Sequence, residues 1–286
     1  MSEASERPRG GGLARSIDAF FTGSDEKASP ASQPADPATR LVAELAVERE
    51  EERREELFDA CARLGLRAAR ALADALATTE DRFARRAYSD ALIRMGADGL
   101  PVVEEMMDDP RWFVVRNGVS ILGEVGGERA VELLTGALAR PEPKVRRDAL
   151  LALAKQGGSD AGQLAYGMLD DPTAMVRAAA ATAAGELGVE RAVRLLQRML
   201  ANEDDPDVTL AVLHALGRLA DPGAVQAIER QAVGSFLRRP PPDVRIAAYR
   251  ALRHIGTPRA RRLLNQAVDD RDPAVKAEVR RLLGMS

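Results

Sequence analysis

Apolar residues recur along most of this chain at one fixed spacing. A small or branched apolar residue is followed by apolar residues 4, 7, 8 and 11 positions later, and usually by glycine at position 12. The copy that begins at Val176 continues through Ala180, Ala184 and Leu187 to Gly188. Because an α-helix has about 3.6 residues per turn, these positions share one helix face, and the glycine suits a left-handed helix end. Each copy therefore predicts one amphipathic helix.

The pattern is also periodic. Its copies begin at Ala84, Val114, Val145, Val176, Val208, Val244 and Val275. By subtraction, successive copies are 30, 31, 31, 32, 36 and 31 residues apart, which is typical of stacked repeats. A second amphipathic segment follows each copy, as at 128–139 and 190–201, and Asp-Pro pairs such as Asp171-Pro172 separate many units because the residue before proline disfavours helix. We therefore predict an all-α array with two helices per repeat.

Two segments precede the array. Residues 1–36 are rich in Ser, Pro, Gly and charge, which predicts a disordered tail. A possible linear binding motif lies within this tail, and its apolar residues at helical spacing are Leu13, Ile17, Phe20 and Phe21; an ordinary tail is the favoured interpretation. Residues 37–64 follow as a predicted acidic capping helix, with 8 acidic and 3 basic side chains over 41–60. The repeat array is predicted to span 65–286.

The residues of the repeat carry a family resemblance. The stretch from Asp171 to Gly188 reads Asp-Pro-x-x-x-Val-Arg, followed by regularly spaced alanines and two glycines, and 242–256 and 272–284 repeat much of it. This unit is similar to the HEAT repeat, in particular to the short bacterial form that resembles the phycobilisome-lyase repeats. The resemblance implies a right-handed α-solenoid of about seven to eight HEAT-like helix pairs, in which the second helix of each repeat lines the concave face.

The resemblance also implies a ladder between neighbouring repeats, formed by an Asp and an Arg six positions later. Asp171 and Arg177 have this spacing. Arg146 and Arg245 are preceded at the same distance by Arg140 and Arg239. We therefore expect the ladder to be broken at these two repeats.

Composition bounds the function. The net charge is −3, which disfavours nucleic acid or an anionic membrane as a partner. The single cysteine, Cys61, excludes an intrachain disulfide, and neither a signal-like segment nor a membrane-length apolar run is present. We therefore expect a cytoplasmic protein. The sequence contains no nucleophile–base pair, phosphate loop or metal-ligand cluster, so we predict no catalytic residue, no metal site and no cofactor.

Three enzyme groups resemble this architecture. Deoxyhypusine hydroxylases bind two iron ions through repeated His-Glu pairs, whereas His214 is followed by Ala and His254 by Ile. Both histidines are instead predicted to be partly buried and structural. HEAT-like alkylpurine glycosylases need aromatic side chains, which one Trp and three Tyr scarcely supply. Bilin lyase subunits act as binding surfaces, and no residue here indicates a bilin.

A surface remains as the candidate site. The second helices present a column that begins acidic and becomes basic, and its predicted partner-binding residues are Glu104, Glu105, Glu132, Tyr166, Arg194, Arg198, Arg230, Arg262 and Asn265. Residues 238–281 carry 12 basic and 5 acidic side chains, a net charge of +7. We predict a non-catalytic scaffold or adaptor that binds another protein. The alternatives are an accessory lyase or chaperone-like subunit acting on a cofactor-bearing protein, and a nucleic-acid backbone binder using the basic C-terminal third.

Overall fold

The computed structural model describes residues 36–234 and 239–285. The candidate tail motif, Leu13, Ile17, Phe20 and Phe21, lies outside the described residues. All regular structure in the described part is helical and comprises sixteen α-helices together with four 3₁₀ helices, at Gly96–Asp98, Met168–Asp170, Glu190–Ala192 and Pro222–Ala224. The prediction of an all-α fold is confirmed.

The α-helices follow one another as pairs. α1 (Pro37–Val47) and α2 (Glu51–Leu64) come first. Seven pairs follow: α3 (Leu66–Thr78) with α4 (Arg82–Met95), α5 (Leu100–Met107) with α6 (Trp112–Val125), α7 (Glu128–Ala137) with α8 (Pro143–Gln156), α9 (Ser159–Gly167) with α10 (Ala174–Glu186), α11 (Val193–Asn202) with α12 (Pro206–Leu219), α13 (Val225–Val233) with α14 (Pro242–Ile255), and α15 (Pro258–Gln266) with α16 (Pro273–Leu282). The predicted number of helix pairs is therefore correct.

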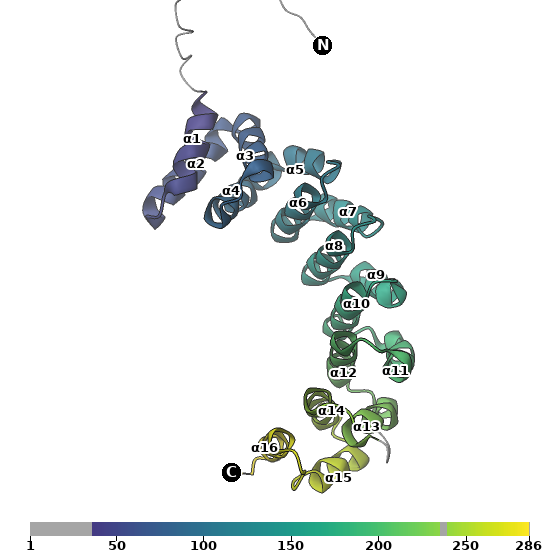
Figure 1. Ribbon diagram of the computed structural model, residues 1–286. Helices are drawn as coiled ribbons and strands as arrows, with labels where there is room; N and C mark the ends of the chain where they lie inside the picture. Colours follow the sequence, from purple (N-terminus) through teal and green to yellow (C-terminus); the bar gives the residue numbers. More distant parts are fainter. Residues whose placement is uncertain (1–35, 235–238, 286) are drawn as a thin grey trace, which may run out of the picture. The chain divides into compact units, whose positions relative to one another are not determined.

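The pairs stack into two rows. In Figure 1 the even-numbered helices α4 to α16 lie along the inner side of the curved array, and the odd-numbered helices α3 to α15 lie along its outer side. We call these the inner row and the outer row. Successive inner helices pack closely against one another, whereas successive outer helices share few contacts. The inner row consists of the helices that carry the repeated apolar pattern.

Small residues explain the close packing of the inner row. Three inner helices present a glycine to an alanine of the next inner helix: Gly123 to Ala152, Gly185 to Ala215 and Gly217 to Ala251. A Cβ atom at Gly185 would lie 2.7 Å from the Cα of Ala215, too close for van der Waals contact. The family resemblance placed the second helices on the concave face, and this is wrong here. The glycine–alanine contacts draw the pattern-bearing helices together, so the second helices form the outer row.

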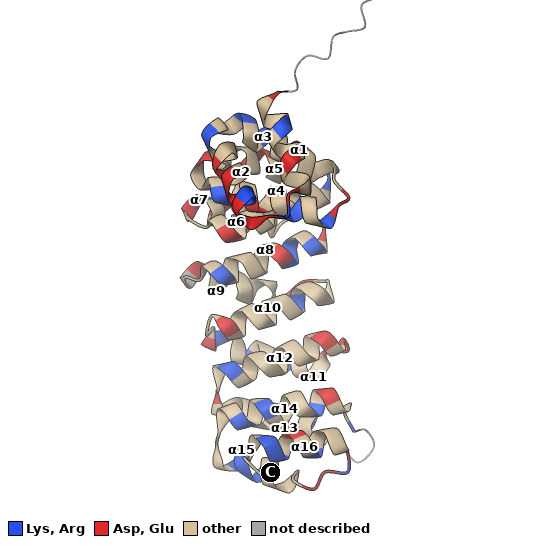
Figure 2. Ribbon diagram, turned by 90° about the vertical axis from the view of Figure 1, so that its left-hand side faces the viewer, with Lys and Arg blue, Asp and Glu red and all other residues tan. Residues whose placement is uncertain are grey.

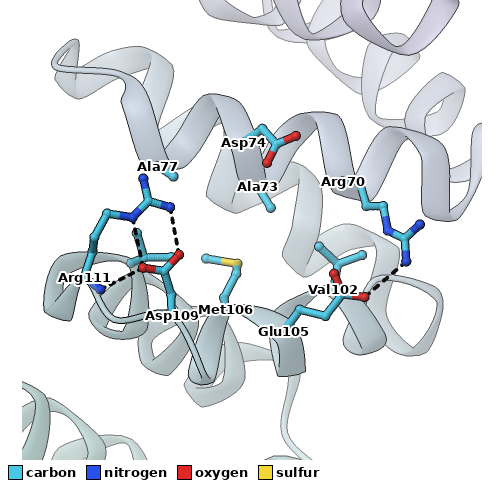
Figure 3. Close-up of a pocket in the computed structure, with 10 residues that line it drawn as sticks. Arg70, Ala73, Asp74, Ala77, Val102, Glu105, Met106, Asp109 and Arg111 are labelled. Atoms are coloured by element: carbon cyan, nitrogen blue, oxygen red, sulfur yellow. Dashed lines mark hydrogen bonds and ion pairs between the residues drawn. The ribbon is translucent and has the colours of Figure 1, made fainter.

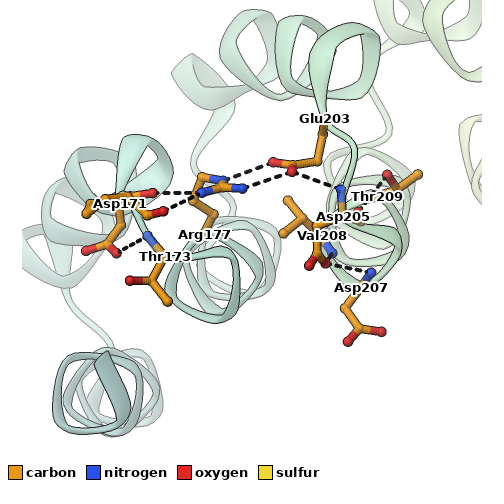
Figure 4. A network of polar contacts seen from close by, with 9 residues as sticks. Asp171, Thr173, Arg177, Glu203, Asp205, Asp207, Val208 and Thr209 are labelled. Atoms are coloured by element: carbon orange, nitrogen blue, oxygen red, sulfur yellow. Dashed lines mark hydrogen bonds and ion pairs between the residues drawn. The ribbon is translucent and has the colours of Figure 1, made fainter. Parts of the chain in front are cut away.

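A buried ladder of ion pairs links each of several inner helices to the turn before the next one. Nε and Nη2 of Arg146 donate to the two carboxylate oxygens of Asp171, both at 2.9 Å. Arg177 binds the carboxylate of Glu203 in the same bidentate way at 2.9 Å (Figure 4), and Arg245 binds Asp270. The ladder therefore runs from one repeat to the next.

The breaks predicted at Arg146 and Arg245 do not occur. Nη1 of Arg146 donates to the carbonyl oxygen of Arg140 at 2.9 Å, just as Nη1 of Arg177 donates to the carbonyl oxygen of Asp171 at 3.0 Å. Each of these arginines thus contacts the backbone of the residue six positions earlier, so the contact forms whether that residue is Asp or Arg. The carboxylate comes from the following repeat.

The acidic segment 37–64 forms two helices rather than one capping helix. Glu48, after the last residue of α1, has an extended backbone with φ −68° and ψ 130°. Its carboxylate accepts the backbone N–H groups of Arg49 and Glu50 at 2.7 and 2.8 Å, which separates α1 from α2. Leu45 and Leu57 are buried in the same apolar core as the repeats. The segment therefore continues the apolar core of the repeats at their N-terminal end.

Candidate functional site

The predicted site residues lie on successive helices of the outer row. Glu104 and Glu105 belong to α5, Glu132 to α7 and Tyr166 to α9, and the basic members follow on α11, α13 and α15. The side chains of the basic members Arg194, Arg198, Arg230 and Arg262 are exposed, as is that of Asn265. The sequence therefore identified residues that share one face. It assigned that face to the wrong side of the array.

The acidic end of this column is neutralised by neighbouring arginines. Arg129 Nε donates to Glu104 at 2.7 Å and its Nη1 donates to Glu132 at 2.8 Å. The hydrogen bond from Arg129 lowers the pKa of Glu104 below its ordinary value. Arg70 Nη2 donates to Glu105 at 3.1 Å. All three predicted glutamates therefore already have a cationic partner.

Figure 3 shows a small pocket at this acidic end, between α3 and α5. Its volume is about 220 Å³. Arg70 and Glu105 pair on one side, and on the other Arg111 donates from Nε and Nη2 to Asp109 at 2.9 and 2.7 Å. The hydrogen bond from the Arg111 side chain lowers the pKa of Asp109. Because both arginines already bind a carboxylate, this pocket offers no unpaired cation to a ligand among the described residues.

The basic end of the column differs. Among the described residues, no ion pair or side-chain hydrogen bond engages the guanidinium groups of Arg194, Arg198, Arg230 or Arg262. We call these four residues the basic strip. Glu229 lies nearby on α13, but Arg259 binds its carboxylate at 2.7 Å. Tyr166 is covered by the guanidinium of Arg191, whose Cζ lies 4.7 Å from the ring centroid. The basic strip therefore carries uncompensated positive charge over three successive outer helices.

The inner row presents a more apolar surface, which sequence reasoning missed. Figure 2 shows this side, with few charged residues across α10 and α12 and several basic ones on α14 and α16. Leu151 on α8 and Met175 on α10 are 40% and 37% exposed. Trp112 and Phe113 on α6 meet edge to face with centroids 6.2 Å apart, and Lys144 Nζ lies 5.1 Å from the Trp112 ring. The sequence contained one indication of this surface, which is an apolar residue outside the core positions of the pattern. Phe113 and Met175 directly precede a pattern start, and Leu151 lies six residues after one.

The prediction that His214 and His254 are partly buried is wrong. Both side chains are exposed and line one pocket between α12 and α14, with a volume of about 330 Å³. They lie at positions 6 and 10 of the pattern, which fall between its core positions. Nearness to an apolar face of the helix therefore did not imply burial.

Over 36–234 and 239–285, the His, Cys, Asp and Glu side chains form no group of three or more that could hold a metal ion. No helix in those ranges is long and apolar enough to cross a membrane. Cys61 is buried, and burial raises the pKa of its thiol.

A family model described as HEAT repeats matches residues 163–235 and 230–286. The prediction of HEAT repeats is thereby confirmed for residues 163–286, and the described chain is an all-α repeat solenoid. No curated protein matches the chain.

The solved structures that are similar to it include the following three. An engineered protein is 19% identical over 86% of this chain and 77% of its own, with a TM-score of 0.47. The complex of CpcE and CpcF of phycocyanin lyase from Nostoc sp. PCC7120 is 22% identical over 90% of this chain and 100% of its own, with a TM-score of 0.41. Human deoxyhypusine hydroxylase in complex with glycerol is 19% identical over 79% of this chain and 96% of its own, with a TM-score of 0.38. None of these similarities bears on function, because each TM-score is below 0.5.

Proposed function

We propose that this chain is a non-catalytic protein-interaction scaffold, and that its basic strip binds an acidic segment of a partner protein. The observation that supports this most directly is the difference in pairing along the outer row. The glutamates at one end are held by Arg70 and Arg129, whereas the four arginines of the basic strip have no carboxylate partner among the described residues. Unpaired surface charge of one sign favours a partner of the opposite sign.

An acidic polypeptide fits the basic strip better than nucleic acid does. Residues 238–281 carry a net charge of +7 whereas the whole chain carries −3, so the chain outside 238–281 is acidic and repels a polyanion long enough to reach it. Stacking of bases on aromatic rings supports much single-strand binding, and Tyr166, the aromatic side chain in the predicted column, is already covered by Arg191. An acidic segment needs only charge complementarity over a limited length. It also suits the long regular surface that stacked repeats provide.

Capture from native lysate with charge-reversed variants tests this function. The first variant combines Arg194→Glu, Arg198→Glu, Arg230→Glu and Arg262→Glu, and we expect it to lose the captured protein. A control with the same net charge combines Arg63→Glu, Arg82→Glu, Arg86→Glu and Arg271→Glu, which are exposed arginines elsewhere, and should retain it. A chain that begins at Asp36 should also retain the partner.

The outcomes separate the alternatives. Equal retention by both charge-reversed variants would refute the role of the basic strip. Loss on removal of residues 1–35 alone would move the function to the motif that contains Leu13 and Phe21. A chromophore in the captured partner would favour the accessory-subunit alternative. Capture of nucleic acid whose affinity falls steeply with salt would favour the backbone-binding alternative.

A further inference from the structure

The pocket between α12 and α14 lies on the inner row and is separate from the basic strip. Leu210 and Gly217 of α12 contribute to its wall, together with Ala247 and Ala251 of α14. Gly217 approaches Ala251 so closely that a Cβ atom there would lie 2.9 Å from the Ala251 Cα. The base of the pocket is therefore apolar and is held by backbone packing rather than by mobile side chains.

Four basic side chains surround this apolar base. Arg218 and His214 of α12 line the pocket opposite Arg250 and His254 of α14. Both arginines are permanently charged, and a histidine adds positive charge whenever it is protonated. No acidic side chain lines the pocket among the described residues. The positive charge of Arg218 thus faces a second basic side chain, His254, across two packed helices, and an anion between them would be attracted.

At the equivalent positions of α6 and α8, oppositely charged side chains lie over the contact between the two helices. Glu124 and Lys155 occupy position 10 of their repeats and form an ion pair at 2.6 Å. Arg218 and His254 occupy position 10 on α12 and α14, where both side chains are basic.

A second ion pair between α6 and α8 also has no counterpart between α12 and α14. Arg116 pairs with Asp148 across α6 and α8 at 2.5 Å, and the matching residues at the α12–α14 interface are Leu210 and Ala247. Two ion pairs are thus replaced by one basic pair and one apolar pair at the same place in the fold. This substitution opens an apolar pocket with a basic edge.

The carboxylates on neighbouring helices are engaged or lie at a distance. Glu278 of α16 accepts from Arg250 Nε at 2.7 Å and from Arg281 at 2.8 and 2.7 Å, so two arginines share one carboxylate. Asp207 and Asp243 lie in the first turns of α12 and α14, whereas Arg218 and His254 lie in the last turns. Glu186 holds the matching position on α10 and forms no ion pair with Arg218, whose Nε reaches only the Gly185 carbonyl oxygen, at 3.5 Å.

We propose that this pocket binds an organic anion in which a carboxylate is carried on an apolar body. The apolar body would lie against Leu210, Ala247 and Ala251, and the carboxylate would lie between Arg218 and His254, with Arg250 and His214 beside it. The volume of about 330 Å³ suits a group of the size of one or two rings. Such a group can be a free organic acid or an acidic side chain flanked by apolar residues in a polypeptide.

Calorimetric titration of the full chain with 1-naphthoate tests the proposal, with the neutral 1-naphthamide as the matched ligand. We expect one naphthoate site and at least tenfold weaker binding of the amide. Arg218→Gln combined with His254→Gln should weaken naphthoate binding at least tenfold. Arg82→Gln combined with Arg86→Gln alters exposed arginines on the inner helix α4 and should leave it unchanged. Circular dichroism confirms that each variant is folded.

A second arm distinguishes the two sources of the anion. It compares acetyl-Leu-Glu-Phe-amide with acetyl-Leu-Gln-Phe-amide. Tighter binding of the glutamate peptide than of naphthoate assigns the pocket to a polypeptide ligand, and the reverse order assigns it to a free organic acid. Binding of neither naphthoate nor the glutamate peptide would overturn the proposal. It would also be overturned if the ligand that binds more tightly bound no better than its neutral counterpart, naphthamide or the glutamine peptide, or kept its affinity in the Arg218/His254 variant. Because the basic strip is on the other row, these results do not depend on partner capture.

Discussion

Two interfaces of the inner row, α6 with α8 and α12 with α14, share the same close backbone contact but differ in the side chains that lie above it. Gly123 packs against Ala152 in the first pair, and Gly217 packs against Ala251 in the second. Above this contact, α6 and α8 are joined by Arg116–Asp148 and Glu124–Lys155. The described α12–α14 interface has no ion pair there, and a pocket with basic edges takes its place.

At these two interfaces the glycine–alanine contact, rather than the surface ion pairs, sets how closely the inner helices approach. α12 and α14 pack at least as closely as α6 and α8 although they lack the two ion pairs. Exposed ion pairs contribute only about 0–1 kcal/mol each, whereas steric complementarity between backbones determines how closely two helices approach. Side chains above the contact are therefore free to serve a ligand.

The largest expected effect concerns a second difference between the two regions, the buried ladder. α8 carries Arg146 at position 1 of its repeat, and α12 carries Thr209 there. The side chains of Arg146 and Asp171 are only 11% and 6% exposed. Arg146→Met leaves the Asp171 carboxylate buried without its cation, and we expect a loss of about 3–5 kcal/mol in the free energy of unfolding, measured in urea.

A double variant isolates the cause of that loss. Arg146→Met combined with Asp171→Leu removes both charges and should recover much of the stability, because well-packed apolar groups can replace a buried ion pair. Lys155→Met removes an exposed partner and should cost less than about 1 kcal/mol. A large effect of Lys155→Met, or a small effect of Arg146→Met, would contradict this account of the ladder.

The glycine contact should show the next largest effect, and the effect should be similar in both regions. Gly123→Ala places a Cβ 2.9 Å from the Ala152 Cβ, and Gly217→Ala places one 2.9 Å from the Ala251 Cα. Each change forces two packed helices apart, and we expect each to cost about 1–3 kcal/mol in thermal or urea unfolding.

Gly136 of α7 is the matched control, since a Cβ there has no neighbour within 4 Å. Gly136→Ala should stabilise the chain by about 0.5–1 kcal/mol, because alanine favours helix over glycine. If Gly123→Ala and Gly217→Ala were harmless, the close approach would not be what shapes the inner row.

Acid should weaken the ion pair between Arg250 of α14, which lines the pocket, and Glu278 of α16. Hydrogen bonds from Arg281 and Arg250 lower the pKa of Glu278 to about 2. A lowered folded-state pKa means that the unfolded chain binds the proton more readily, so this stabilisation is present above pH ~4.5 and is lost as the pH falls toward 2. Because Arg250 and Arg281 are 56% and 66% exposed, solvent screening limits the effect to about 1 kcal/mol.

The thermal unfolding midpoint between pH 5 and pH 2.5 measures this effect. Glu278→Gln cannot ionise, so its midpoint should fall less steeply with acid than that of the unaltered chain. The ladder ion pairs at Asp171 and Glu203 also lose stability in acid, and they do so equally in the unaltered chain and in the Glu278→Gln variant. Burial opposes ionisation of Asp171, but hydrogen bonds from Arg146 and Thr173 outweigh it and lower its pKa, and Arg177 lowers the pKa of Glu203. Parallel acid curves for the two proteins would contradict the assignment to Glu278.

The smallest expected effect on stability comes from converting one region into the other. Arg218→Glu places an acid opposite His254, as Glu124 lies opposite Lys155. We expect a gain of about 0.2–0.5 kcal/mol from the new pair, measured by thermal unfolding, together with loss of 1-naphthoate binding. A gain in stability with unchanged naphthoate binding would show that the basic edge of the pocket has no role in binding an anion.

Particular residues show how far the candidate sites could be predicted. The column from Glu104 to Arg262 was found because each repeat contains the same two helices, which bring equivalent positions to one face although the spacing varies from 30 to 36 residues. The pairing of Glu104 with Arg129 could not be found, since it depends on side-chain directions across two helices, whereas Glu132 lies three residues after Arg129 on the same helix. The exposure of His214 was also missed, because a helix position beside the core can face either a neighbour or solvent.

The sequence alone was sufficient to predict the pattern-bearing helices, their ends near glycine, the period and the all-α repeat fold, although not the division of 37–64 into two helices. These features follow from local apolar spacing and backbone preference, which act within a few residues. Only the tertiary structure decided which helices form the inner row, which carboxylate each buried arginine binds, and that His214 and His254 share a pocket. Such features depend on the distance at which neighbouring helices pack, and that distance is set by contacts such as Gly217 with Ala251, between residues far apart in the chain.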